Sequence, residues 1–160
     1  MMEETFIMAE ISKAQKERQG SFGFLLQLLA RRMDGVMKER LSEIDVDMKI
    51  FANLRILAEK DGITQRELGR LLDFPEYFTS RNVDLLVEAG FAERRPDPNS
   101  RRTVLVHLTE LGREKAKQLP KVVSAANLEF LEPLSKKERS DLIALLHKVA
   151  RIPKGGEPTL

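Results

Sequence analysis

The chain has 160 residues, of which 42% are hydrophobic and 32% charged, and its formal net charge is +2. A chain of this size is expected to form one domain and to bury about 70% of its unfolded surface. The absence of cysteine excludes disulfides, thiolate zinc sites and thiol redox sensing, and two separate histidines cannot build a metal site within one chain. The N-terminus is acidic and its apolar run is too short for a secretory signal. Because no window approaches the roughly 20 apolar residues of a membrane span, we expect a cytoplasmic protein.

Helical periodicity dominates the N-terminal third. Residues 1–20 fit either a helix or a frayed arm. Asp47 is placed to cap a helix that ends at Asp61-Gly62, because Gly62 can adopt the left-handed conformation. Before it, apolar residues recur at three- and four-residue steps and predict a helix of about five turns. Its apolar stripe consists of Phe22, Leu26, Leu29, Met33, Val36 and Leu41.

The middle of the chain has the pattern of two short helices joined by a tight turn. Thr64 and Glu67 have capping-box spacing at the start of the first helix. Pro75 sets the first turn of the second, which we expect to end at Gly90. In a helix-turn-helix motif, the second helix lies across a DNA major groove and the first contacts the backbone. The predicted DNA-contacting residues of this pair are Thr64, Gln65, Glu76, Tyr77, Thr79, Ser80 and Arg81. Arg81 is the candidate for a guanine contact, because a guanidinium matches O6 and N7 bidentately.

Residues 91–108 predict a β-hairpin with an arginine-rich tip. Strands are expected at 91–94 and 103–108, with turn chemistry at 96–100. An arginine on a narrow hairpin can enter the minor groove, where negative potential is concentrated. The predicted contact residues of this hairpin are Arg94, Arg95, Asn99, Ser100, Arg101 and Arg102. Alternatively, Arg101 or Arg102 pairs with Asp97 and only stiffens the turn.

The C-terminal third is helical. Thr109 is placed to cap a long helix, and Pro120 is expected to kink or break it, because proline removes a backbone donor. Ser135 and Glu138 have the capping-box pattern at the start of a last helix. Residues 153–160 are expected to be a disordered tail. Together the elements predict a mainly α fold with a small β-hairpin wing, a winged helix-turn-helix.

A longer pattern runs through the second helix and the hairpin. It reads Val83-Asp84-x-Leu86-x-x-x-Gly90-Phe91, then Arg94, then Arg102-x-Val104-x-Val106-x-Leu108-Thr109-x-x-Gly112. This pattern resembles the MarR family of transcription regulators, and the likeness extends from about residue 22 to 149. The resemblance implies a homodimer that reads a pseudo-palindromic operator. Residues 47–109 would form the winged-helix DNA-binding lobe, and 1–46 with 110–152 the helical dimerisation region.

The resemblance also assigns residues. It implies that Arg102 is the wing arginine of the family and that Arg81 is a frequent arginine of the recognition helix. The family usually has an aspartate two residues before the wing arginine, where this chain has Ser100. Asp97 could replace that carboxylate if the turn folds back.

The resulting hypothesis is a dimeric repressor that is released by a small aromatic or anionic ligand, as in the family it resembles. The ligand site is unknown; Arg31 and Arg32 could meet an anion or simply form a solvated helix face. The alternative is a winged-helix protein–protein interaction module without sequence-specific DNA binding, which the acidic Glu76, Asp84 and Glu88 would suit. An enzyme is not expected, because no nucleophile–base pair or metal cluster is recognisable, and no cofactor or metal is expected.

Overall fold

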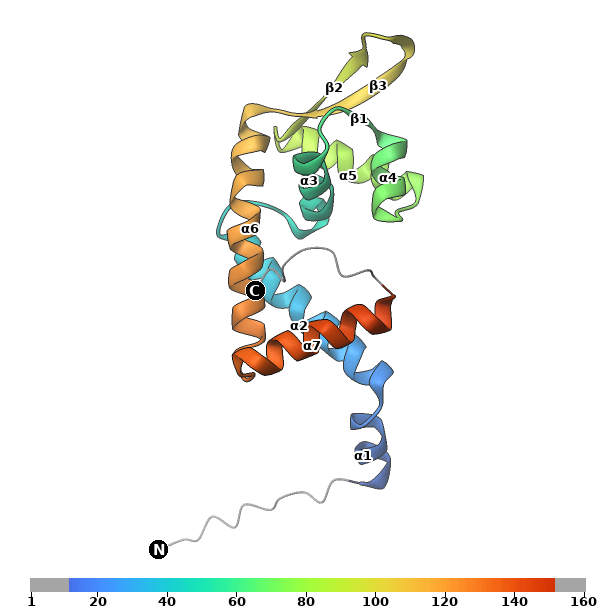
Figure 1. Cartoon of the computed structure of the whole chain (residues 1–160). Coiled ribbons are helices and arrows are strands. Elements are labelled where there is room, and N and C mark those ends of the chain that lie inside the picture. Colours follow the sequence, from blue (N-terminus) through green and yellow to red (C-terminus); the bar gives the residue numbers. More distant parts are fainter. Residues whose placement is uncertain (1–11, 152–160) are drawn as a thin grey trace, which may run out of the picture. The chain divides into compact units, whose positions relative to one another are not determined.

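The computed structural model describes residues 12–151 (Figure 1). Within them the elements follow the order α1 (Lys13–Gln19), α2 (Phe22–Ser42), α3 (Met48–Glu59), β1 (Ile63–Thr64), α4 (Gln65–Leu72), α5 (Glu76–Glu88), β2 (Ala92–Asp97), β3 (Ser100–Leu108), α6 (Glu110–Phe130) and α7 (Lys136–Ala150). The mainly α fold with a small β wing is confirmed. The expected tail at 153–160 and the first part of the expected N-terminal arm, residues 1–11, lie outside the described residues. None of the helices in residues 12–151 is long and apolar enough to cross a membrane.

The chain divides into two compact units, and the boundary after Gly35 falls inside α2. In the first unit, Ser12 and Gln15 form a capping box that starts α1. The predicted apolar stripe of α2 is present, but its N-terminal part is exposed. Phe22 is 60% exposed and Leu26 49%, whereas the only buried residues of α2 are Met37 and Leu41, in the second unit.

The core of the second unit lies between α3, α4, α5 and the sheet. On α3, the fully buried Leu54 and Leu57 follow the predicted helical spacing. The N-cap prediction for Asp47 is confirmed, because its side chain accepts a hydrogen bond from the Lys49 amide at 2.7 Å. The other apolar side chains sealed in this core include Ile50, Leu68, Val83, Leu86, Phe91, Val106 and Leu108.

The sheet has three antiparallel strands in the order β1-β3-β2 (Figure 1). The prediction of a single hairpin missed β1, whose two residues pair with Val106 and Leu105 of β3. Two residues are too few to show an alternating pattern. The hairpin itself is longer than expected, since β2 and β3 leave only Pro98 and Asn99 in the turn.

Helix starts agree with the predictions only in part. Ser135 and Glu138 form the full capping box at the start of α7. Thr64 accepts a hydrogen bond from the Glu67 amide at 3.1 Å, but the Glu67 carboxylate binds Lys60 Nζ at 2.5 Å. Only half of that predicted box therefore exists. The hydrogen bond from Lys60 lowers the pKa of Glu67 below its ordinary value.

Pro120 does not break α6, which runs without interruption from Glu110 to Phe130. Proline removes one intrahelical donor, a local loss. Around it, Ala116, Leu119 and Ala126 are buried, and α6 packs against α3. Buried apolar side chains therefore lie on both sides of Pro120, and one missing hydrogen bond does not end the helix.

Candidate nucleic-acid interface

Helix α5, the predicted recognition helix, has one buried and one exposed side. Its buried residues are Thr79, Asn82, Val83 and Leu86, at steps of three and four. Glu76, Tyr77 and Arg81 are exposed, with Tyr77 at 77%, and Ser80 is half-buried. The exposed side of α5 therefore carries four of the five residues predicted to contact DNA on this helix.

Thr79 is the exception, and its predicted DNA contact is wrong. It is only 1% exposed, and its hydroxyl donates a hydrogen bond to the Pro75 carbonyl at 3.1 Å. A Cβ atom added to Gly69 of α4 would lie 2.7 Å from the Thr79 oxygen, so the two helices touch at this point. Thr79 is a packing residue between α4 and α5. The neighbouring Phe78 ring packs edge-on against Phe74, with ring centroids 4.9 Å apart.

Arg94 joins the wing to both helices of the helix-turn-helix. Its Nη2 lies 2.5 Å from Asp84 Oδ1 on α5 and 3.4 Å from Gln65 Oε1 at the start of α4. Arg95, the next residue of β2, pairs with Glu93. Both guanidinium groups therefore have carboxylate partners within the lobe, and their predicted contact with DNA stays a prediction.

The tip of the wing contains a bulge that exposes two arginines. Pro96 pairs with Val104, whereas the next residue, Asp97, pairs with Ser100, so residues 101–103 are extra on β3. A bulge of this kind redirects side chains away from the regular alternation of a strand. Arg101 and Arg102 are exposed, and no hydrogen bond or ion pair holds them among residues 12–151.

Asp97 braces the turn without an arginine. Its Oδ1 accepts a hydrogen bond from the Asn99 amide at 2.8 Å, and Thr103 Oγ1 donates to Ser100 Oγ at 2.8 Å. The alternative in which Asp97 pairs with Arg101 or Arg102 is therefore not the arrangement found. Asn99 is exposed and Ser100 half-buried beside the bulge.

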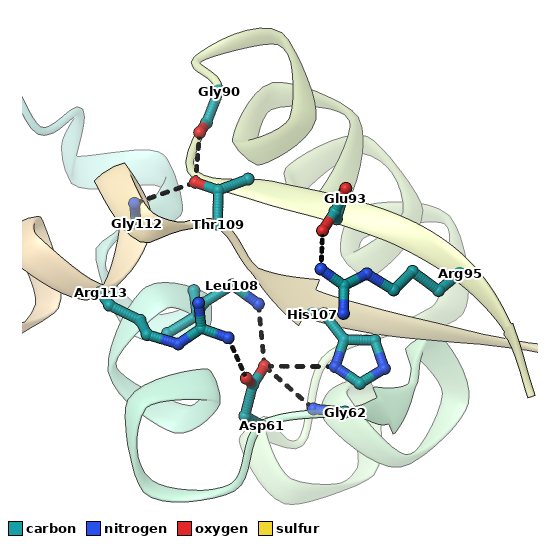
Figure 2. Close-up of polar contacts among 10 residues, drawn as sticks. All are labelled: Asp61, Gly62, Gly90, Glu93, Arg95, His107, Leu108, Thr109, Gly112 and Arg113. Carbon is teal, nitrogen blue, oxygen red and sulfur yellow. Dashed lines mark hydrogen bonds and ion pairs between the residues drawn. The ribbon is translucent and has the colours of Figure 1, made fainter.

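The base of the wing is tied to the flanking helices by Asp61, which the sequence indicated only as a helix end (Figure 2). Asp61 Oδ1 accepts hydrogen bonds from the amides of Gly62 at 3.0 Å and Leu108 at 2.8 Å. Its Oδ2 lies 3.2 Å from Arg113 Nη2 on α6, and His107 Nδ1 lies 3.9 Å from Oδ1. One carboxylate thus joins the end of α3, the end of β3 and the first turn of α6.

Thr109 forms a second junction at the same place (Figure 2). Its hydroxyl donates to the Gly90 carbonyl at 2.5 Å and accepts from the Gly112 amide at 3.0 Å, which confirms the predicted cap of α6. A Cβ atom at Gly112 would lie 1.9 Å from the Phe91 carbonyl oxygen. Only a glycine permits this approach of α6 to the chain that leaves α5.

A cavity of about 290 Å³ lies between α3 and α6. Its walls are mainly apolar, and Arg55 and Glu59 provide charge, with Arg55 Nε 3.8 Å from Glu59 Oε1. The lining residues are Arg55, Ala58, Glu59, Ala116, Leu119, Pro120 and Val123. Among the described residues, no group of three or more His, Asp and Glu side chains could hold a metal ion.

Comparison with known proteins places this arrangement in a family. A family model described as MarR family matches residues 52–103. The multiple antibiotic resistance protein MarR of Escherichia coli is 32% identical over 131 residues, which are 79% of this chain and 89% of MarR. A crystal structure of a mutant E. coli MarR with operator DNA matches with a TM-score of 0.71 and 32% identity, covering 79% of this chain and 91% of that chain. The Mycobacterium tuberculosis MarR family protein Rv2887, solved with salicylic acid, matches at 26% identity and a TM-score of 0.66, covering 81% and 96%. With its winged helix-turn-helix and this extent of similarity, the chain belongs to the MarR family and is a DNA-binding transcription regulator.

Proposed function

We propose that this regulator binds a pseudo-palindromic operator as a homodimer, with α5 of each protomer in a major groove and the β2–β3 wing in the adjacent minor groove. The main support for this proposal is that Arg81, Arg101 and Arg102 of the winged-helix lobe are exposed and have no partner among residues 12–151. A guanidinium on a helix in the major groove can read guanine, and arginines on a wing suit the negative potential of the minor groove. The E. coli MarR complex with operator DNA supports this assignment by analogy.

The remaining proposed contact residues bind bases or phosphates according to their position. Tyr77, the most exposed of them, is suited to a thymine methyl group or a phosphate. Thr64 and Gln65 lie at the N-terminus of α4, where backbone amides and the helix dipole favour a phosphate. The other proposed contacts are Glu76, Ser80, Asn99 and Ser100.

The dimer is proposed from apolar helix surfaces that nothing in the described chain covers. On α7, Leu145 is 61% exposed and Val149 63%. On α2, Phe22, Leu25, Leu26 and Leu29 are all at least 40% exposed. Runs of exposed apolar side chains on amphipathic helices mark protein-binding surfaces, and α2 and α7 supply them here.

The dimer can be tested by solution mass. Val149→Asp with Leu145→Asp should lower the mass measured by light scattering from two chains to one, because two carboxylates would enter an apolar interface. Ser140→Asp is the matched control, since Ser140 is exposed and lies on the opposite side of α7 from these two residues. A wild-type protein that stays monomeric at high concentration would remove the homodimer from the proposal.

Repression follows if the bound dimer occludes a promoter, and we propose release by a small aromatic carboxylate in the cavity between α3 and α6. Its volume of about 290 Å³ suits a single-ring ligand, and Arg55 offers a cation at its wall. Salicylic acid bound to the relative Rv2887 supports this ligand class. Salicylate should weaken operator binding in the wild type and less so in Val123→Phe, which fills the cavity; equal weakening would exclude this cavity.

The decisive experiment for DNA binding is sequence selection from random duplexes with the purified protein at stated salt. We expect an enriched two-fold symmetric site and a log–log salt slope of about −0.9 for each phosphate contacted. A protein-interaction module would enrich no sequence. Asp84, one of the acidic residues that favoured this alternative, is paired with Arg94 of the wing.

A further inference from the structure

Two asparagine side chains are sealed inside the core of the DNA-binding lobe, where α5 packs on α3. Asn53 on α3 is 0% exposed and Asn82 on α5 is 2% exposed. Asn82 Nδ2 donates a hydrogen bond to Asn53 Oδ1 at 3.1 Å. Asn53 Nδ2 is buried and has no hydrogen-bond partner among the residues that the structure describes.

This pair is a poor way to stabilise the fold. A buried donor without an acceptor carries a desolvation penalty. Replacing both hydrogen-bonding side chains by apolar groups of similar shape leaves the stability of a fold nearly unchanged or raises it. What a buried hydrogen bond supplies is direction, because it is strong only over a narrow range of distance and angle. Apolar surfaces tolerate sliding and rotation more easily. A single buried asparagine contact can therefore select one register of two packed helices.

The position of the pair connects it to base recognition. Asn82 directly follows Arg81, and the other polar residue on the buried side of α5 is Thr79, against Gly69 of α4. The apolar anchors Val83 and Leu86 lie further along the helix. The Thr79 hydroxyl is bonded to Pro75 at the start of the same helix, and its contact with Gly69 is only a close approach. The hydrogen bond of Asn82 with Asn53 is therefore a directional contact that links the part of α5 beside Arg81 to another helix.

Small rotations matter at this distance from the helix axis. With side chains, a helix has a radius of about 5–6 Å, so a rotation of about 10° moves its surface by about 1 Å. That displacement takes a bidentate hydrogen bond out of its favourable range. Contacts with phosphates, made by long mobile side chains, would be far less sensitive.

We propose that Asn53 and Asn82 are positioning residues that fix the rotation of α5 and thereby determine how sharply the protein discriminates between base pairs. The inference rests on the proposed docking of α5 in the major groove. In this inference the exposed side chains contact the bases, and the buried hydrogen bond determines how selective those contacts are.

The test separates stability from selectivity. Asn53→Ala with Asn82→Leu, and the reverse pair Asn53→Leu with Asn82→Ala, remove both amides at similar total volume. We expect a melting temperature equal to or above the wild type. Affinity for random duplex and its salt slope should stay unchanged. The ratio of operator to random affinity should fall about tenfold, the size of one lost base-pair contact.

Two further variants complete the design. Asn53→Asp keeps the acceptor for Asn82 Nδ2 but buries a carboxylate, so it should lower the melting temperature and preserve the selectivity ratio. Val83→Ala leaves a cavity next to Asn82 in the sequence of α5. It should also lower the melting temperature without changing the ratio of operator to random affinity. If one of the two double variants does not fold, the other one gives the result. If neither folds, a fall in the ratio of operator to random affinity in Asn53→Asp overturns the proposal.

The outcomes also distinguish this inference from the proposed function. A wild-type protein without any preferred sequence removes the DNA-reading role of α5 itself. A clear wild-type preference that both folded apolar pairs retain removes only the positioning role of Asn53 and Asn82.

Discussion

The Asp61 carboxylate accepts a hydrogen bond from the backbone amide of Leu108 at 2.8 Å, which links the segment that follows α3 to the last residue of the wing. These residues are 47 positions apart in the sequence. The same carboxylate binds Arg113 of α6, so a single side chain connects the end of the wing to the first turn of the long helix (Figure 2).

Removing the Asp61 carboxylate should destabilise the fold. Asp61→Ala leaves the Leu108 amide without its acceptor, and we expect the free energy of unfolding to fall by about 1–3 kcal/mol in urea titration. Arg113→Ala is the matched control, because it removes only the exposed partner and should cost less than about 1 kcal/mol. Equal losses in the two variants would show that the ion pair, and not the amide contact, holds the junction.

Gly112 should not tolerate a side chain. The Cβ atom of Gly112→Ala would lie 1.9 Å from the Phe91 carbonyl oxygen, so the backbone must move, and we expect a loss of about 3 kcal/mol or more. Gly35→Ala in α2 is the control, since nothing lies within 4 Å of the added atom. Helix propensity predicts that it gains about 0.5–1 kcal/mol. Thermal unfolding of both variants provides the comparison.

Arg102 should contribute more to DNA affinity than Arg113. Arg102 is exposed in the β3 bulge without a partner among the described residues, whereas Arg113 is bound to Asp61. We expect Arg102→Ala to weaken operator binding about tenfold, or about 1.4 kcal/mol. If Arg102 meets a phosphate, the log–log salt slope should also become shallower by about 0.9. Fluorescence anisotropy at several salt concentrations measures both quantities, and equal losses in the two variants would count against the wing assignment.

Arg81 should determine preference at one base pair of each half-site. In Arg81→Ala the discrimination at that pair should fall by about 1–3 kcal/mol, while affinity for random duplex changes little. Arg66→Ala, an exposed arginine of the preceding helix, should reduce affinity uniformly across sequences if it contacts a phosphate. A selection profile that Arg81→Ala leaves unchanged would exclude Arg81 from base recognition.

The Lys60–Glu67 contact should be visible in acid titration. The hydrogen bond from Lys60 lowers the pKa of Glu67 below its ordinary value of 4.5 in the folded protein. A lowered folded pKa stabilises the protein above the unfolded pKa, and that stability is lost as the pH falls through the folded pKa. In Lys60→Met, the pKa of Glu67 measured by NMR should rise. The wild type should be more stable than the variant at neutral pH, and this difference should disappear below the folded pKa of Glu67. A Glu67 pKa that the substitution leaves unchanged would contradict the contact.

Local rules predicted much of this chain correctly. Asp47, Thr109 and Ser135 cap their helices as expected, because a capping bond joins residues only two or three positions apart. Gly62 and Gly90 have positive φ angles of 71° and 74°, as helix ends with glycine predict. The same short-range patterns indicated the helix-turn-helix and the arginine-rich wing, and hence most of the exposed residues of the candidate interface.

Contacts between distant segments decided the rest. Thr79 was expected on the exposed side of α5 together with Ser80. It is buried because Gly69 of α4 has no side chain and leaves room for the Thr79 hydroxyl. Glu67 binds Lys60 in place of completing its capping box, and α6 continues through Pro120 because apolar packing outweighs one missing hydrogen bond. The hydrogen bonds of Asn82 with Asn53 and of Asp61 with Leu108 join residues 29 and 47 positions apart. A linear pattern carries no information on which distant partner a polar group will meet, since that depends on how the helices and strands pack in three dimensions.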